Sequence, residues 1–238
     1  ALDLDCLLMY DMAHVLGLAG PYFQQPFKEG ADLVTGSTHK TFFGTQRGIV
    51  AFDLDPQGDL ELWEAISRRA FPGSVSNHHL GTLLGLLVAA MELNAFKETY
   101  QKQVVTNAKT LAKALADAGL DVAGDPSIGY TETHQVIVKV GYAKGPEIAR
   151  ALESNHIICN FQAAPEEEGF TASGALRLGV AEMTRFGMQA ADFQTLAQLM
   201  ADVIRDKKKV RQKVIDLRRN FLQMQYCFSE KDLDGLLA

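Results

Sequence analysis

Two short apolar runs near the start of the sequence each lead into residues that can take part in chemistry, and this arrangement restricts the fold more than any other feature. Residues 7–10 precede Asp11, and residues 31–36 precede the run from Ser37 to Lys40. Apolar runs of this length, bounded by turn residues, predict buried strands. In open α/β sheets, ligands bind beyond the carboxyl ends of the strands. The sequence therefore predicts an α/β fold with a polar site at one edge of a sheet.

The first predicted strand has no partner before it. A sheet needs neighbouring strands for stability, yet the sequence opens on Ala1 and enters this strand almost at once. We therefore expect a fragment, or one half of a split protein. Residues 48–52 predict a further strand, and residues 60–69 predict a short amphipathic helix with Asp59 as its N-cap.

A long helical pattern covers residues 79–115. Its first part is apolar on nearly all sides, which predicts burial. Its second part, residues 100–118, is amphipathic and ends at Gly119, a residue suited to a helix C-cap. We place a domain boundary inside this helix, which divides the chain into residues 1–108 and 109–238.

Short elements alternate in the second of these domains. The pattern predicts strands at 135–140, 157–160 and 175–180, and helices at 146–154, 192–206 and 208–221. Such an alternation of few-residue strands and helices is typical of an α+β domain.

Charge and cysteine content exclude several classes of function. The net charge is -6, so no broad basic surface for nucleic acid is expected. The basic run at 207–213 is interpreted as a solvated helix face. Cys6, Cys159 and Cys227 are odd in number and widely spaced, which favours a reducing compartment over a disulfide scaffold and leaves no pair at metal-ligand spacing. We expect a cytoplasmic protein without a metal site.

The sequence also gives expectations about membranes. No stretch reaches ~18 uninterrupted apolar residues, so no transmembrane helix is expected. The first residues lack a basic region and a cleavage site, so they do not resemble a signal peptide. We therefore expect no membrane partner.

Asp11, His14 and Lys40 are the first candidate site residues. Asp11 and His14 follow the first predicted strand three residues apart, so both can face a crevice at the sheet edge. The alternative is that Asp11 caps the following turn and that His14 packs. Lys40, flanked by hydroxyls and by His39, suits a nucleophilic amine, whereas the alternative is an ordinary surface lysine. The glycine pattern before Lys40 excludes a P-loop.

Two arginines add to these candidates. Arg47 lies between Gly44 and Gly48 in a short polar loop, where it either reaches an anionic group or remains solvated. Arg177 lies inside an apolar predicted strand, and buried arginines are rare unless they are paired. Its partner is either a protein carboxylate or a substrate carboxylate held by two parallel hydrogen bonds.

Taken together, these features resemble serine hydroxymethyltransferases in order and spacing, over nearly the whole chain. The stretches that carry the resemblance are YDMAHVLGL, STHKTFFG, FPG, YQKQVVTNAKTLAKAL and SGALRLGVAEMTRFGM. The resemblance implies the fold-type-I, aspartate-aminotransferase-like architecture of pyridoxal-phosphate transferases. Residues 1–108 then form the C-terminal half of the cofactor-binding large domain, and residues 109–238 form an α+β C-terminal small domain.

The resemblance also implies roles around the cofactor. Lys40 corresponds to the lysine that binds pyridoxal 5'-phosphate as a Schiff base, with Thr38 and His39 beside it to assist proton transfer. Asp11 corresponds to the carboxylate that keeps the pyridine nitrogen protonated. His14 corresponds to the residue near the phenolic oxygen of the cofactor.

Four further residues take roles from the same resemblance. Arg47 lines the cofactor site, and Ser76 follows the FPG stretch, where it can donate a hydrogen bond to the cofactor. Arg177 corresponds to the clamp for the carboxylate of an amino-acid substrate. His134 matches a family histidine that we interpret as structural.

Three departures from the common family pattern resemble a side branch. The stretch after Lys40 is one residue longer before Arg47. Residues 74–78 replace a Gln-Gly-Gly-Pro run whose glycines approach the cofactor phosphate of a neighbouring subunit. Residues 160–162 replace an Asn-Lys-Asn segment that lies near the pterin in folate-using members, which leaves the use of tetrahydrofolate in question. The branch includes 2-methylserine hydroxymethyltransferases and threonine-type transaldolases.

The chemistry that these relatives share is the making or breaking of the Cα–Cβ bond of serine- or glycine-like β-hydroxy amino acids. We expect a homodimer or higher assembly with sites at the subunit interface. The alternatives are another fold-type-I activity such as an aminotransferase, and an inactive remnant or partner subunit. In the family the amino-terminal half supplies the phosphate cup and the ring-stacking residue, so we expect the isolated chain to lack turnover.

Overall fold

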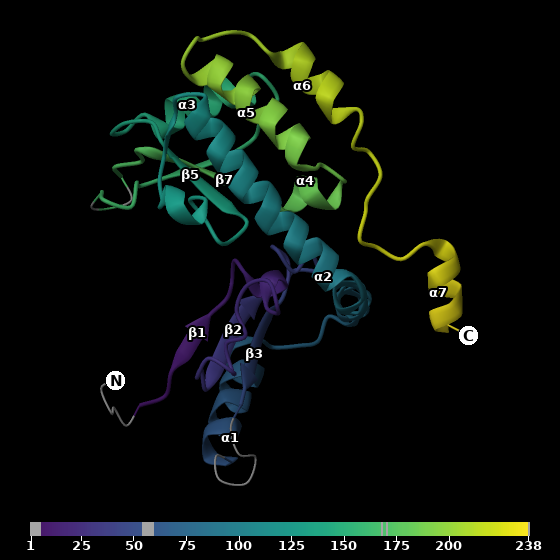
Figure 1. The fold of residues 1–238 in the computed structure, drawn as a ribbon. Helices are drawn as coiled ribbons and strands as arrows, with labels where there is room; N and C mark the ends of the chain where they lie inside the picture. Colours follow the sequence, from purple (N-terminus) through teal and green to yellow (C-terminus); the bar gives the residue numbers. More distant parts are fainter. Residues whose placement is uncertain (1–5, 54–59, 168, 170, 238) are drawn as a thin grey trace. The chain divides into compact units, whose positions relative to one another are not determined.

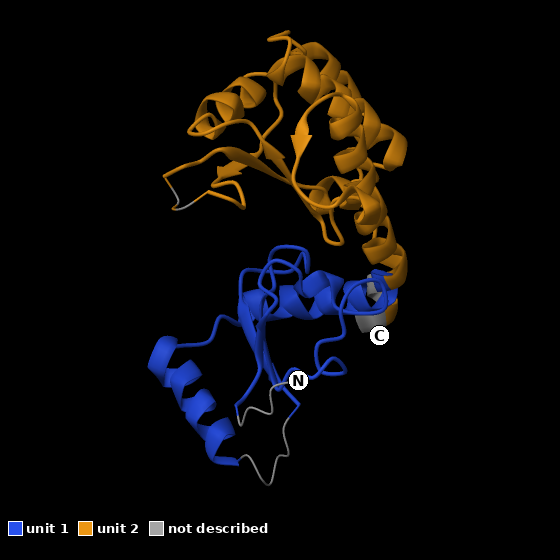
Figure 2. Ribbon diagram, turned by 60° about the vertical axis from the view of Figure 1, so that its left-hand side comes forward, with its two compact units in different colours: residues 1–97 blue, residues 98–238 orange. Residues whose placement is uncertain are grey.

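The computed structural model describes residues 6–53, 60–167, 169 and 171–237 of the 238-residue chain. The chain divides into two compact units, residues 1–97 and residues 98–238 (Figures 1 and 2). The division falls inside the long helix, where the boundary at residue 108 was also placed. The functional assignment of residues 1–108 and 109–238 stays a prediction, and each compact unit is described here by itself.

The first unit is built on a three-stranded sheet with the order β1-β2-β3. Its strands are β1 (Met9–Asp11), β2 (Leu33–Ser37) and β3 (Gly48–Phe52). β1 pairs with β2 in parallel, with Asp11 opposite Thr35, and β3 pairs with β2 in antiparallel. The parallel pair is the predicted one, and its two strands end at the same edge of the sheet.

A small apolar core underlies this edge. Met12 and Leu16 pack with Ala31 and Val34. Leu16 begins a short 3-10 helix, η1 (Leu16–Leu18), all of whose residues are buried. The turn after β1 is therefore anchored by burial immediately beyond Asp11, which fixes the position of that residue at the end of the strand.

Two helices and a short helical segment complete the first unit. α1 (Leu60–Arg68) has no buried residue, and η2 (Arg69–Ser74) follows it. The predicted N-cap, Asp59, lies outside the described residues. α2 (Leu80–Asp117) continues into the second unit.

The first part of α2 corrects the expectation of burial and bears on the expectation about membranes. It was predicted to be buried, yet Leu80 is 67% exposed and Leu84 is 66% exposed. By length and composition alone, α2 is also a helix long and apolar enough to cross a membrane, and only 17% of its most apolar window is buried. Length and composition alone do not place this helix in a membrane, so the expectation of no transmembrane helix stays a prediction.

The second unit contains an antiparallel sheet with the order β4-β5-β7-β6. Its strands are β4 (Asp121–Val122), β5 (Gln135–Lys139), β6 (Asn160–Gln162) and β7 (Ala175–Gly179). β5 and β7 agree with the predicted strands. The strand predicted at 157–160 was wrong in position, because residues 157–159 form no strand and the pairing with β7 starts at Asn160.

Five α-helices and a short 3-10 helix complete the described part of the second unit. They are α3 (Gly145–Glu153), α4 (Ala181–Arg185), α5 (Ala190–Ile204), α6 (Arg211–Arg218) and α7 (Glu230–Leu237), with a short 3-10 helix η3 (Pro126–Ile128). α3 packs against α5 and against β6 and β7 (Figure 1). The second half of α2 contributes one buried row, Tyr100, Val104, Ala108, Leu111 and Leu115. α2 ends at Asp117, and Gly119, two residues on, adopts the left-handed conformation typical of a helix C-terminus (φ 81°).

Candidate active site

Asp11 lies at the end of β1 and shapes the turn that follows. Its Oδ1 accepts a hydrogen bond from the Ala13 amide at 2.9 Å, while the side chain stays exposed. His14, three residues on, is also exposed. The structure therefore contains the turn cap that was considered as the alternative role of Asp11. One carboxylate oxygen makes this bond, so the cap and a second contact by the other oxygen are compatible.

Lys40 lies in a tight loop at the end of β2. Thr38 is 1% exposed, and its hydroxyl donates to the carbonyls of Thr45 at 2.7 Å and Arg47 at 3.0 Å. Lys40 is half-buried, and its Nζ donates to Ser37 Oγ at 3.3 Å, whereas His39 is exposed. Thr38 thus holds the loop closed, and the amine of Lys40 is kept near the end of the strand.

Thr41 joins the two loops, and sequence reasoning missed this residue. Its hydroxyl donates to the His14 carbonyl at 2.9 Å and accepts from the Gly17 amide at 3.0 Å. A β-carbon built on Gly17 would lie 2.1 Å from the Thr41 carbonyl oxygen, so only glycine permits this close approach. Asp11 and Lys40 therefore follow the ends of adjacent parallel strands, on loops that are bonded to one another.

Arg47 is held by the start of α2. Its Nη2 donates to the carbonyl of His79 and, at 2.8 Å, to the hydroxyl of Thr82. Its Nε is buried without a hydrogen-bond partner among the described residues. A buried donor of this kind costs free energy unless an acceptor reaches it, so Arg47 retains one donor for an anionic group.

Ser76 lies in the exposed stretch between η2 and α2. The structure places it in the same compact unit as Lys40 and Asp11. Its role as a donor to the cofactor stays a prediction.

Arg177 lies in the middle of β7, in the second unit. Ile137 of β5 and Asn160 of β6 are its neighbours across the sheet. Its flanking residues Leu176 and Leu178 are buried, so alternation along the strand puts Arg177 on the opposite, half-open face. Among the described residues, no hydrogen bond or ion pair is formed by its guanidinium, which leaves both of its parallel donors available to a ligand.

His134 contributes to packing rather than to the candidate site. His134 is 8% exposed, and its carbonyl accepts from the Val180 amide at 3.1 Å.

Within the described part of the chain, no group of three or more His, Cys, Asp or Glu side chains is placed to hold a metal ion.

Comparison with known proteins identifies the family of this arrangement. A family model described as serine hydroxymethyltransferase matches residues 1–200. The chain belongs to the serine hydroxymethyltransferase family. The serine hydroxymethyltransferase of Archaeoglobus fulgidus is 46% identical over 97% of the chain, and that of Saccharolobus islandicus is 44% identical over 95%. These matches cover 52% and 53% of the two relatives, so the chain spans about half their length.

A solved structure supports the fold. The L-threonine transaldolase of Pseudomonas fluorescens, determined in its internal aldimine state, is 35% identical to this chain with a TM-score of 0.83. The match covers 97% of this chain and 54% of the transaldolase. The predicted fold-type-I architecture of pyridoxal-phosphate transferases is therefore confirmed, and so is the resemblance to this branch of the family.

The residues around Lys40 fit the cofactor of this family. Three groups lie near this end of the sheet. They are the half-buried amine of Lys40, the exposed carboxylate of Asp11 at the end of the neighbouring strand, and the buried Nε donor of Arg47. An amine for covalent attachment, a carboxylate for a ring nitrogen and a donor for an anion are the groups that pyridoxal phosphate requires. All three belong to the first compact unit.

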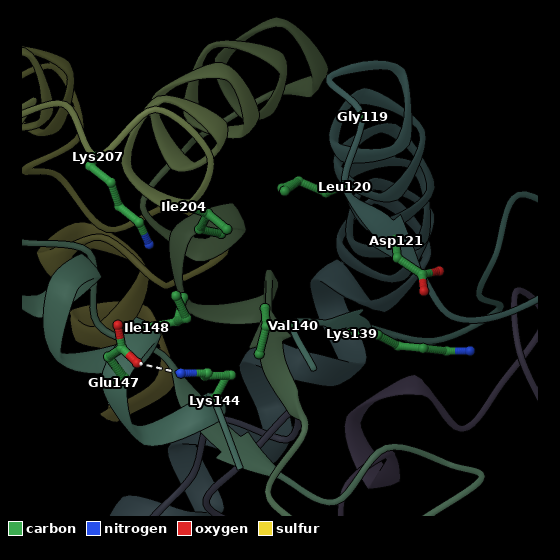
Figure 3. A pocket seen from close by; sticks show the side chains of 10 residues that line it. All are labelled: Gly119, Leu120, Asp121, Lys139, Val140, Lys144, Glu147, Ile148, Ile204 and Lys207. Carbon is green, nitrogen blue, oxygen red and sulfur yellow. Dashed lines mark hydrogen bonds and ion pairs between the residues drawn. The ribbon is translucent and has the colours of Figure 1, made fainter. Parts of the chain in front are cut away.

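A separate cavity of about 410 Å³ lies in the second unit (Figure 3). Leu120, Val140 and Ile204 are among its lining residues, together with the ion pair of Lys144 and Glu147 at 3.3 Å. No predicted site residue lines this cavity. It is therefore a feature of the second unit alone and takes no part in the assignment of the active site.

Proposed function

We propose that this chain is part of a pyridoxal-phosphate enzyme that makes or breaks the Cα–Cβ bond of serine- or glycine-like β-hydroxy amino acids. The observation that carries the proposal is the arrangement of Lys40 and Asp11 at the ends of adjacent parallel strands, on loops joined through Thr41. The family of the chain supports the same chemistry.

Pyridoxal phosphate, when bound, supplies an electron-withdrawing ring that stabilises negative charge at the Cα of an amino acid. Lys40 would hold the cofactor covalently through its amine. The carboxylate of Asp11, one oxygen of which accepts from the Ala13 amide, would favour the protonated form of the ring nitrogen. Thr38 keeps the loop in place, and His39 is exposed beside the lysine, where it can transfer protons.

The remaining predicted residues bind polar and anionic groups of the cofactor and of the amino-acid substrate. Arg47 presents its Nε to an anionic group, and His14 lies on the turn that Thr41 fixes. Ser76 supplies a further donor. Arg177 binds the carboxylate of the amino acid through two parallel hydrogen bonds. The cellular setting that fits this assignment is cytoplasmic amino-acid and one-carbon metabolism, in a homodimer.

A second candidate within the family is a folate-independent transaldolase. The sequence Asn160-Phe161-Gln162 forms β6, beside Arg177, where folate-using members carry Asn-Lys-Asn. The likeness to an L-threonine transaldolase supports this alternative. The two activities differ in whether tetrahydrofolate accelerates the cleavage of serine. A rate that is independent of added tetrahydrofolate, together with transfer from threonine to an aldehyde, identifies the transaldolase.

Borohydride trapping tests the cofactor assignment. The experiment uses a polypeptide that contains this chain together with the part that corresponds to the unmatched half of its relatives. It is loaded with pyridoxal phosphate, reduced with borohydride and digested. We expect the label on the peptide that contains Lys40. Lys40→Arg removes the label, whereas Lys28→Arg, a control on an exposed surface lysine of the same unit, retains it. A label on any other lysine refutes the assignment.

A further inference from the structure

The cavity of about 410 Å³ in the second unit is built where four elements begin or end (Figure 3). Leu120 follows α2, and Val140 follows β5. Ile148 lies near the start of α3, and Ile204 is the last residue of α5. Ile148 is 7% exposed, and the other three side chains are half-buried. The cavity therefore has an apolar floor, and its volume lies in the range of small-molecule sites, roughly 300–1,000 Å³.

Charged side chains surround this apolar floor, and most of them are already paired. Lys144 Nζ lies 3.3 Å from Glu147 Oε2, and Lys139 Nζ lies 2.7 Å from Glu166 Oε1. In Figure 3 the side chains of Lys139 and Asp121 point away from the cavity. Among the described lining residues, no unpaired carboxylate therefore points into it.

Lys207 is different, because its side chain points toward the cavity in Figure 3. Its amine forms no hydrogen bond or ion pair with any residue that the structure describes. The neighbouring cations are occupied: Arg205 donates to the carbonyl of Ala118, and Lys208 Nζ donates to Asp206 at 2.7 Å. Lys207 thus retains its positive charge for a ligand in the cavity.

The backbone at Lys207 is held in a costly conformation. Its φ of 55° lies in the left-handed region, which glycine adopts freely and lysine rarely does. The amide of Lys208 donates to the Asp202 carbonyl at 3.0 Å and closes the turn around it. Strained residues of this kind persist where the surrounding structure fixes them, and they cluster at sites that bind ligands. The turn therefore fixes where the lysine side chain leaves the end of α5.

Helix ends at the cavity also bear on the charge of a ligand. α3 begins there at Gly145, and a helix N-terminus carries partial positive charge. The opposite charge at the end of α2 is offset by Arg205, which binds the Ala118 carbonyl. A β-carbon built on Gly119 would lie 2.7 Å from Arg205 Nη1, so the guanidinium packs directly on the turn after α2. The local charges therefore favour an anion.

We propose that this cavity binds a small organic acid with one carboxylate and an apolar body. Lys207 binds the carboxylate, and the apolar body lies against Leu120, Val140 and Ile204. A single free cation suits a monoanion, whereas a phosphate would lose hydration against apolar side chains without enough donors to replace it. No residue assigned to the cofactor or to the amino-acid substrate lines the cavity, so this site is independent of the proposed function.

Phenylacetate and its uncharged analogue phenylethanol are suitable probes for the cavity. Both are titrated into the cofactor-loaded polypeptide used for borohydride trapping, with its isoleucine methyl groups labelled for nuclear magnetic resonance. We expect phenylacetate to shift the methyl signals of Ile148 and Ile204, and to leave that of Ile128, which lies outside the lining, unchanged. Phenylacetate should bind about fivefold more tightly than phenylethanol at low ionic strength, and added salt should reduce this preference.

Lys207→Gly tests the charge without endangering the fold. Glycine adopts the left-handed conformation without strain, so the melting temperature should not fall. The preference for phenylacetate over phenylethanol should disappear, while the affinity for phenylethanol stays the same. Lys209→Gly, an exposed lysine two residues on that does not line the cavity, is the matched control and should keep the preference.

Five results would overturn the proposal. They are unchanged methyl signals of Ile148 and Ile204, equal affinity for the acid and the alcohol, a preference that survives Lys207→Gly, a preference that Lys209→Gly also removes, and loss of these methyl shifts in Arg177→Lys. The last result would place the acid at the predicted substrate clamp. Binding of phenylacetate through Lys207 in a polypeptide that takes no borohydride label on Lys40 contradicts the proposed function and leaves this site intact.

Discussion

The buried hydroxyl of Thr41 donates a hydrogen bond to the carbonyl oxygen of His14 across 27 residues of sequence. The same hydroxyl accepts from the amide of Gly17, so one side chain bonds twice to the turn that begins at Asp11. Lys40 directly precedes Thr41 in the sequence. The relative position of the amine and the carboxylate therefore depends on a residue that has no chemical role of its own.

Thr41→Val is expected to weaken cofactor binding without removing the Lys40 amine. Valine keeps the shape of the side chain but leaves the Gly17 amide without its acceptor, and an unsatisfied buried donor costs about 1–3 kcal/mol. We expect the dissociation constant of pyridoxal phosphate to rise about tenfold and hydrogen exchange at the Gly17 amide to become faster. Thr41→Ser should restore both.

The control for this variant is Thr106→Val. Thr106 also donates to a backbone carbonyl, that of Lys102, but it is exposed on α2 in the second unit. Its replacement should change neither measurement. Equal cofactor affinity in Thr41→Val and the unaltered protein would show that Thr41 contributes only to packing.

Asp11→Asn is expected to reduce turnover more than it reduces stability. The asparagine side-chain oxygen can still accept from the Ala13 amide, so the turn is preserved. It carries no charge to hold a proton on the ring nitrogen, and losing one such electrostatic contact lowers rates by about 10²–10³-fold.

The matched control is Asp32→Asn. Asp32 also accepts from a backbone amide, that of Leu8 at 2.7 Å, in the same unit. Both variants should melt at similar temperatures, and only Asp11→Asn should lose activity in the steady-state assay. Unchanged turnover in Asp11→Asn would limit Asp11 to its role in the turn.

Local patterns in the sequence were sufficient to predict the elements that carry the candidate site. The positions of β1, β2 and β3 follow from short apolar runs. The predicted burial was wrong for β1, in which no residue is buried, whereas most of β2 is buried. The candidates Asp11 and Lys40 follow from their positions at the carboxyl ends of two of these strands, since Asp11 is the last residue of β1 and Lys40 lies three residues beyond β2. The family resemblance added the roles, which periodicity alone does not contain.

Other features depend on contacts that no local pattern encodes. Thr41 bonds to residues 24 and 27 positions away, and a threonine beside a lysine gives no signal of such a contact. The exposure of Leu80 was not predicted, because an apolar helical pattern does not show which faces of the helix other elements cover. β6 was misplaced because the apolar run at 157–159 precedes the residues that pair with β7.

Cys159 is expected to react far more slowly with thiol reagents than Cys6. Burial raises the pKa of the Cys159 thiol to about 11, so only about one molecule in 1,000 carries the reactive thiolate at pH 8. Cys6 is exposed. Labelling with iodoacetamide followed by mass spectrometry should modify Cys6 first, and the rate at Cys159 should still rise between pH 9 and pH 10. In the urea-unfolded chain, which serves as the reference, the two cysteines should react at similar rates. Similar rates in the folded chain would contradict the burial of Cys159.

Arg177→Lys is expected to weaken recognition of the amino-acid substrate and to spare the cofactor. A guanidinium offers two parallel donors to a carboxylate, whereas an ammonium is a single point charge on a more flexible stem. A charge-assisted contact of this kind contributes about 1.5–3 kcal/mol, so the KM for serine should rise by roughly one to two powers of ten. Turnover should also fall, because the carboxylate no longer fixes the orientation of the bond that breaks.

Two titrations of the complete polypeptide check this assignment, one with pyridoxal phosphate and one with serine. Arg150→Lys, on the exposed side of α3, is the matched control and should leave both affinities unchanged. Arg177 lies in the second unit and Lys40 in the first, so a change confined to the serine titration separates substrate recognition from cofactor attachment. Loss of affinity for pyridoxal phosphate with intact affinity for serine would show that Arg177 binds the cofactor rather than the substrate carboxylate.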